Sequence, residues 1–182
     1  MCMGRQTDFA PSLSADLPKQ SERLTFVPST RALAEAESKG KMELSGSLSA
    51  EPPQSWPLEV VAPPDGDGAG WHDYYLTYSP SDGRTLLVGL AGVKRWPAEH
   101  HTLQVGTAIV PEHRGLRLGQ EVVATLGRWG LSQNGFDRVV CDIPAMHPGA
   151  AKSLERAGYV KLQESPAPGF VRFELRKGSE RC

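Results

Sequence analysis

Residues 105–123 read VGTAIVPEHRGLRLGQEVV and join two different structural patterns. The first part is an apolar strand that ends at Val110–Pro111, and a loop rich in glycine and arginine follows it. After the loop, apolar residues recur at helical spacing. They are Leu118, Val122, Leu126 and Trp129. We therefore expect a strand, a tight loop and an amphipathic helix in succession.

The loop Arg114–Gly119 has the chemistry of an anion site. A helix N-terminus offers unpaired N–H groups and the positive end of the helix dipole, and glycine lets a phosphate approach the backbone closely. Arg114 and Arg117 add positive charge. The loop is not a Walker loop, because no Gly-Lys-Ser/Thr follows, and it is not a GxGxxG fingerprint. Without further evidence, a turn of this kind is more often an ordinary helix start.

Strand and helix patterns alternate around this segment. Strands are predicted at residues 23–27, 71–78, 84–93, 102–110, 138–143, 159–163 and 170–175. Helices are predicted at 31–38, from 118 to the break at Gly135, and at 148–157, with a further short helix at 42–50. The three consecutive strands between residues 71 and 110 have short, turn-rich connections, which predicts an antiparallel meander. The expected class is mixed α/β.

The composition excludes several kinds of protein. The formal net charge is −1, so no excess of positive charge exists to drive bulk nucleic-acid binding. No apolar run is long enough for a membrane helix, and residues 1–21 lack an apolar signal core, so we expect a cytoplasmic protein without a membrane partner. Cys2, Cys141 and Cys182 are then expected to be free thiols, and their spacing predicts no metal site.

Three segments resemble the GNAT superfamily of acetyltransferases. Ile109–Gly119 resembles the acetyl-CoA loop of that family, Arg/Gln-x-x-Gly-x-Gly/Ala, with Arg117 in place of the middle glycine. Residues 147–159, HPGAAKSLERAGY, are similar to the family's segment Asn-x-x-Ser/Ala that ends in Leu/Tyr-Glu-Lys-x-Gly-Phe. Residues 23–28, RLTFVP, resemble the first strand of the Rim-type branch, which acetylates protein N-termini. The resemblance covers residues 22–176.

The resemblance implies a fold and an activity. The fold is a central, mostly antiparallel sheet of about seven strands, splayed between strands four and five and flanked by helices. It would occupy residues 22–176 between a flexible N-terminal tail, 1–21, and a C-terminal tail, 177–182. The activity is transfer of an acetyl group from acetyl-CoA to a primary amine, of a protein N-terminus or a small molecule, by direct attack in a ternary complex. Dimers are common in the family, so the resemblance leaves both a monomer and a homodimer as alternatives.

The resemblance also assigns the cofactor contacts. The pantetheine arm would follow the end of the fourth strand, and the pyrophosphate would lie on the loop at the helix start. The residues implied are Ala108, Ile109, Val110, Arg114, Gly115, Leu116, Arg117, Leu118, Gly119, Gln120 and His147. No metal is expected.

Four polar positions of the family are changed here. Gln104 stands where a glutamate often acts as the base, and Leu154 where a tyrosine often protonates the thiolate. Ala150 replaces a serine and His147 an asparagine. The chain is therefore either an enzyme whose base lies elsewhere or an acyl-CoA-binding relative with little or no transferase activity. The replacement candidates are His147, Asp142 and Glu99, for each of which a cap, a turn or an exposed loop is the alternative role.

Overall fold

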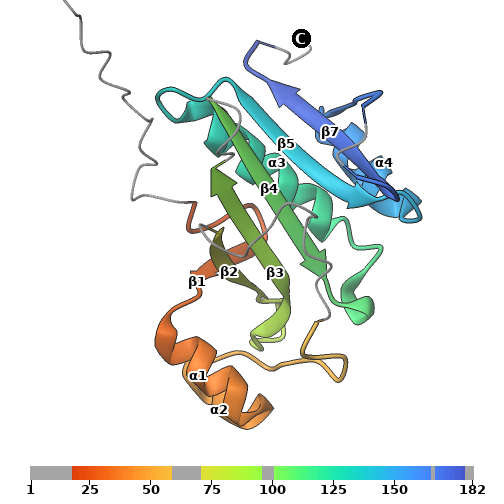
Figure 1. Ribbon diagram of the computed structural model, residues 1–182. Helices are drawn as coiled ribbons and strands as arrows, with labels where there is room; N and C mark the ends of the chain where they lie inside the picture. Colours follow the sequence, from red (N-terminus) through yellow and green to blue (C-terminus); the bar gives the residue numbers. More distant parts are fainter. Residues whose placement is uncertain (1–17, 59–70, 96–100, 165–166, 179–182) are drawn as a thin grey trace, which may run out of the picture.

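The computed structural model describes residues 18–58, 71–95, 101–164 and 167–178 (Figure 1). The elements are β1 (Leu24–Pro28), α1 (Arg31–Lys39), α2 (Lys41–Leu48), β2 (Trp71–Tyr78), β3 (Leu86–Arg95), β4 (Thr102–Ile109), a 3₁₀ turn (Pro111–His113), α3 (Leu118–Ser132), β5 (Arg138–Pro144), α4 (Pro148–Arg156), β6 (Val160–Lys161) and β7 (Phe170–Arg176). Among these described residues, no helix is long and apolar enough to cross a bilayer.

The strands form one seven-stranded sheet in the order β1-β2-β3-β4-β5-β7-β6. All neighbouring strands are antiparallel except β4 and β5, which are parallel. The predicted meander and the mixed α/β class are thus confirmed. The last hairpin differs from expectation, because β6 is only two residues long instead of 159–163. Tyr159 leaves the strand for the core, where its hydroxyl donates to the Val123 carbonyl at 3.0 Å.

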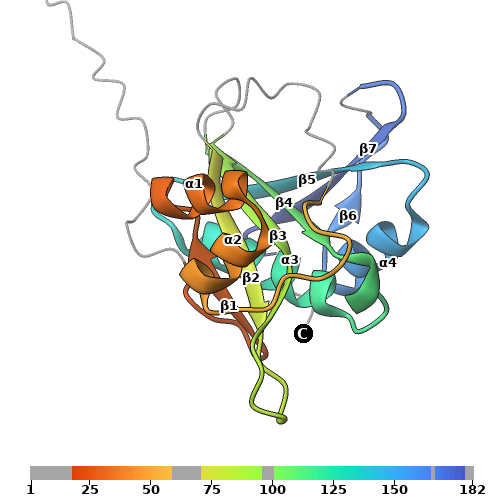
Figure 2. The same cartoon turned by 90° about the horizontal axis from the view of Figure 1, so that it is seen from below.

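The helices cover both faces of the sheet (Figure 2). Alternation along β2 separates the faces, because Tyr74 packs with α3 and α4 whereas Tyr75 packs with α1 and α2. The larger core lies under α3, and the smaller core lies under the helix pair. The smaller core joins α1 and α2 to β2 and β3. On the same side of β5 and β7, among the described residues, lie the charged side chains of Asp142, Arg172 and Glu174.

Local sequence explains where the helices begin and end. The Thr30 side chain accepts a hydrogen bond from the Leu33 N–H and starts α1, and Gly40 ends that helix at a φ of 132°. Pro148 occupies the first turn of α4, as expected from its fixed φ and missing N–H. Gly158, with a φ of 93°, takes the left-handed position after the helix.

Candidate active site

The pairing of β4 with β5 stops after three residue pairs, of which Gln104–Val140 is the last. Beyond this point β4 continues to pair with β3, and β5 continues to pair with β7, but the two strands no longer pair with each other. The backbone of the second half of β4 therefore faces an open gap in the sheet. Residues 106–109 are all partly exposed, in contrast to the buried residues 102–105. The predicted splay is confirmed.

The loop after β4 wraps back to the mouth of this gap. The 3₁₀ turn Pro111–His113 reverses the chain, and the Arg114 Nε donates to the Ile109 carbonyl at 3.1 Å. Gly115 and Arg117 then adopt left-handed backbone conformations, with φ of 82° and 61°. Arg117 stands where the family pattern has glycine, and the left-handed conformation explains why glycine is favoured at this position.

The N-terminus of α3 presents free donors beside the gap. Arg117 is the N-cap residue, and its side chain makes no capping hydrogen bond. The first N–H groups of the helix therefore keep their capacity to bind an anion, and the dipole favours negative charge there. A Cβ built on Gly119 would meet only Ile109 Cγ1, at 3.6 Å, so the glycine leaves room beside β4. Leu118 contributes its backbone only, because its side chain lies in the core.

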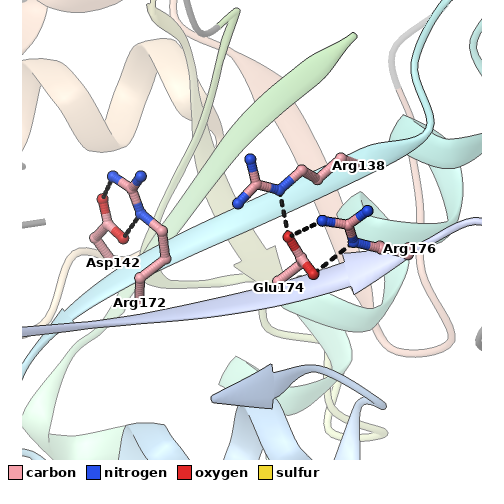
Figure 3. Close-up of polar contacts among 5 residues, drawn as sticks. All are labelled: Arg138, Asp142, Arg172, Glu174 and Arg176. Carbon is pink, nitrogen blue, oxygen red and sulfur yellow. Dashed lines mark hydrogen bonds and ion pairs between the residues drawn. The ribbon is translucent and has the colours of Figure 1, made fainter. Parts of the chain in front are cut away.

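A buried polar network closes the vertex of the splay, and Figure 3 shows its Asp142–Arg172 pair. Gln104 is the last residue of β4 that pairs with β5, and its Nε2 donates at 3.1 Å to Oδ2 of Asp142, two residues beyond Val140 on β5. Arg172 on β7 donates to both carboxylate oxygens of Asp142, each at 2.8 Å. The side chain of Asp142 has no exposed surface. Asp142, a predicted catalytic candidate, thus has both oxygens engaged by protein donors.

A second charged cluster lies farther along the same two strands (Figure 3). Glu174 pairs with Arg138 on β5 and with Arg176 two residues away on β7, where the Arg176 Nε lies 2.6 Å from Glu174 Oε1. Burial alone would raise the pKa of Glu174, but the hydrogen bonds from both guanidinium groups outweigh it and hold the pKa below its usual value. Both clusters lie on the face opposite α3, because the alternate residues Cys141 and Phe173 belong to the α3 core.

The other predicted residues have different surroundings. His147 is exposed at the start of α4, and its ring makes no capping bond. Leu154 is buried in the core, so no proton donor replaces the family's tyrosine there. Cys141 is a free, buried thiol whose pKa is raised to about 12 by burial, with a smaller contribution from the Asp142 charge. Glu99 lies outside the described residues. Within the described residues, no cluster of His, Cys, Asp and Glu has metal-binding geometry.

Sequence reasoning missed the segment that follows α2. Ser55 donates to Glu112, in the turn just before the glycine-arginine loop. Trp56 Nε1 donates to Glu37 on α1 at 2.9 Å, and the Lys41 Nζ donates to the Pro53 and Gln54 carbonyls. These bonds connect the segment after α2 both to the α1–α2 helix pair and to Glu112, which precedes the glycine-arginine loop. Pro52, Pro53 and Pro57 disfavour a regular helix in this segment but do not predict these partners.

A groove of about 530 Å³ lies on the outer side of α3 and begins at Arg117. Its opposite wall is the chain before β1, which Glu121 holds in place through bonds to the Ser21 hydroxyl (2.6 Å) and to the backbone and side chain of Arg23. Burial would raise the pKa of Glu121, but these bonds lower it. The groove is lined by Gln20, Ser21, Glu22, Arg23, Arg117, Gln120, Glu121, Ala124, Thr125 and Arg128.

The sequence matches the family model of the acetyltransferase (GNAT) domain over residues 7–160. No curated protein sequence matches the chain at a significant level. Solved structures with the same fold include an acetyltransferase from Agrobacterium tumefaciens str. C58, with 18% identity and a TM-score of 0.58. That alignment covers 91% of this chain and 98% of the Agrobacterium chain.

Two further structures share the fold at low identity. A putative ribosomal-protein-serine acetyltransferase from Vibrio cholerae has 14% identity and a TM-score of 0.59, over 89% of this chain and 98% of its own. AAC(6')-Ib, solved with ribostamycin and coenzyme A, has 15% identity and a TM-score of 0.50, over 60% of this chain and 66% of its own. At these identities the likeness establishes the fold alone.

Proposed function

The chain belongs to the acetyltransferase (GNAT) domain family, and we propose that it transfers an acetyl group from acetyl-CoA to a primary amine. One observation carries the proposal: the gap between β4 and β5 opens beside a helix N-terminus that no side chain caps. A long, thin cofactor with a pyrophosphate fits this pair of features. Its pantetheine arm would lie along the backbone of Ala108 and Ile109, and its pyrophosphate would take the N–H groups of residues 115–120. Val110, also expected at the arm, is fully buried and its N–H already donates to the Val88 carbonyl at 3.0 Å.

The expected chemistry is direct attack within a ternary complex. The amine nitrogen forms a bond to the thioester carbonyl carbon, the C–S bond breaks, and the electron pair leaves on the CoA sulfur. One amine proton is lost and the thiolate gains one, so atoms and charge balance. The protein contributes orientation, and strand N–H groups polarise the carbonyl oxygen. No covalent enzyme intermediate is required.

The acceptor we propose is the amine of a protein N-terminus or of a small molecule. The first strand resembles that of the Rim-type branch, and the Vibrio cholerae neighbour described as a ribosomal-protein-serine acetyltransferase has the same fold. The alternative is an acyl-CoA-binding relative with little or no turnover. The features that fit this alternative are the changes from the family's glutamate to Gln104 and from its tyrosine to Leu154.

Calorimetry with acetyl-CoA, followed by an assay of CoA release with a panel of peptides and small amines, tests the proposal. We expect saturable binding and turnover with at least one amine. Binding without acetylation of any amine would support the alternative. A ligand that binds only the native state must also raise the melting temperature of the protein. Millimolar acetyl-CoA that neither binds nor raises this temperature would therefore contradict both functions.

A further inference from the structure

The exposed part of β4 ends abruptly at Gly106. Residues 106–109 are partly exposed where β5 has left β4, whereas the residues before them, 102–105, are buried. Gly106 carries no side chain and lies two residues after Gln104, the last residue of β4 that pairs with β5. A ligand that lies along the exposed part of β4 therefore meets the closed part of the sheet at Gln104, which is the inner end of the gap.

On the face opposite α3, buried polar side chains close this inner end. Asp142 lies two residues beyond Val140, the last residue of β5 that pairs with β4. The hydrogen bond that it accepts from Gln104 therefore crosses between the two strands just where the gap opens. Both side chains are buried. Arg172 on β7 donates to both oxygens of Asp142, so the carboxylate cannot swing aside without breaking a bidentate pair.

On the α3 face, the inner end of the gap is packed core. Val105 on β4 and Cys141 on β5 come directly after the last residue pair of the two strands, Gln104–Val140. They are 1% and 3% exposed, and both belong to the core under α3. A core at ordinary packing density accepts extra methylene groups only at a cost in free energy. The inner end of the gap is thus closed on both faces of the sheet.

The pantetheine arm of CoA is long enough to bring a thioester to this closed end. About twelve bonds separate the pyrophosphate oxygen from the sulfur, as many as the backbone of about four extended residues contains. β4 exposes four residues, 106–109, between the closed end and the segment that leads to the glycine-arginine loop. An extended arm with its pyrophosphate at that loop would therefore end beside Gly106. The acyl chain of the thioester would then point toward Gln104 and Asp142.

We propose that Gln104 and Asp142 are specificity-determining residues for the acyl donor, and that they limit it to CoA thioesters of short acyl groups such as acetyl. The inference rests on the proposed function and concerns the donor, not the amine. An acetyl group adds a single methyl group beyond the carbonyl, beside a residue that has no side chain. A longer chain must push the Gln104 amide away from Asp142. That displacement removes a hydrogen bond from a buried charge, which is costly.

Calorimetry with a series of CoA compounds tests the inference without any acceptor amine. The probes are CoA, acetyl-CoA, propionyl-CoA, butyryl-CoA and hexanoyl-CoA. We expect CoA and acetyl-CoA to bind with similar affinity, and butyryl-CoA and hexanoyl-CoA to bind more weakly by about tenfold or more. Equal affinities along the series would overturn the inference and leave the proposed function intact. Failure of every probe to bind, CoA included, would contradict the proposed function and the inference with it.

Gln104→Ala removes most of the side chain that limits the acyl group, while Arg172 still holds Asp142. We expect this variant to bind butyryl-CoA within about threefold of acetyl-CoA, because the truncation leaves a cavity at the inner end. A variant that is folded by circular dichroism but discriminates like the wild type would overturn the role of Gln104. The wild-type series decides the question by itself if the variant does not fold.

Glu174→Gln is the matched control for this substitution. Glu174 is also a buried charged residue on the face opposite α3, but it lies opposite Val140, which still pairs with β4. Glu174→Gln should therefore bind the series with the affinity ratios of the wild type. Loss of discrimination in this variant as well would show that any disturbance of the sheet widens the gap, and would overturn the specific role of Gln104 and Asp142.

Discussion

Ser55 donates its backbone N–H, at 3.1 Å, and its hydroxyl, at 2.6 Å, to the carboxylate of Glu112, which lies 57 residues later in the chain. The next residue, Trp56, donates to Glu37 on α1, and the same carboxylate accepts a bond from the Tyr75 hydroxyl at 2.7 Å. The segment after α2 is thus attached at one end to the helix pair and at the other to the turn before the glycine-arginine loop.

The Ser55–Glu112 contact should depend on pH. The bond from the Ser55 hydroxyl, with smaller contributions from backbone N–H groups, lowers the pKa of Glu112 below its usual value. Since the folded-state pKa is depressed, the stabilisation is complete above the unfolded value, about 4.3, and is lost as the pH falls through the folded value. We expect Glu112→Gln to lower the urea midpoint at pH 7, and this difference from the wild type to shrink as the pH falls below 4.

The control for this comparison is Glu35→Gln, which removes an exposed ion pair with Arg31 on α1. Exposed pairs of this kind contribute little, so the urea midpoint should change only slightly at either pH. If Glu112→Gln and the wild type differed as much at pH 3 as at pH 7, the carboxylate would not be the group responsible.

Gly119 should tolerate a methyl group but not a negative charge. A Cβ at this position meets Ile109 Cγ1 at 3.6 Å, an ordinary contact, and the helical backbone accepts alanine. Gly119→Ala should therefore keep the fold and most of its CoA affinity. Gly119→Glu places a carboxylate where the pyrophosphate is expected, so we predict a loss of CoA affinity of about tenfold or more by calorimetry. Equal affinity of both variants would remove Gly119 from the site.

Local patterns were sufficient to predict most of the fold. The helical spacing that begins at Leu118 gave the start of α3, and Pro148 gave the start of α4, because both signals depend on neighbouring residues. The shortened β6 was missed because Tyr159 is drawn out of the strand by a buried bond to Val123, 36 residues away in the chain. Local periodicity carries no information about a partner so far away in the chain.

The candidate site was predictable only in part. The loop Arg114–Gly119 has a linear motif, so its residues could be named in advance. The partners of Asp142 could not be, because Gln104 and Arg172 come from two other strands and meet it only through the sheet register. The sequence alone left Asp142 open as a base, and the structure shows that its oxygens are already occupied.

Arg117 offers a way to separate backbone strain from charge. Its φ of 61° is a conformation that costs a residue with a Cβ about 1–2 kcal/mol. Arg117→Ala and Arg117→Gly both remove the guanidinium, but only glycine relieves the strain. We predict that the two variants lose CoA affinity equally and that the loss shrinks at high salt. Relief of the strain should make Arg117→Gly more stable than Arg117→Ala in urea unfolding. The difference should be about 1 kcal/mol or less, because glycine loses more entropy on folding than alanine does. Equal stability would contradict the strain.

Gly127 in α3 should not tolerate alanine. A Cβ there would lie 2.6 Å from the Tyr159 hydroxyl and 2.8 Å from Leu175 Cδ2, both in the core between α3 and the sheet. The tyrosine could move only by giving up its bond to the Val123 carbonyl. We therefore expect Gly127→Ala to destabilise the fold by about 1–3 kcal/mol in urea unfolding, as overpacked cores generally do.

Gly46 in α2 is the matched control, because it is also a helical glycine but has no atom within 4 Å of a built Cβ. Gly46→Ala removes the entropic disadvantage of glycine in a helix without any clash, so it should stabilise the protein by about 0.5–1 kcal/mol. The two substitutions add the same methyl group and should have opposite signs, since only Gly127 allows α3 to approach β7 closely. If Gly127→Ala also proved stabilising, the close packing of α3 against Tyr159 and Leu175 would be wrong.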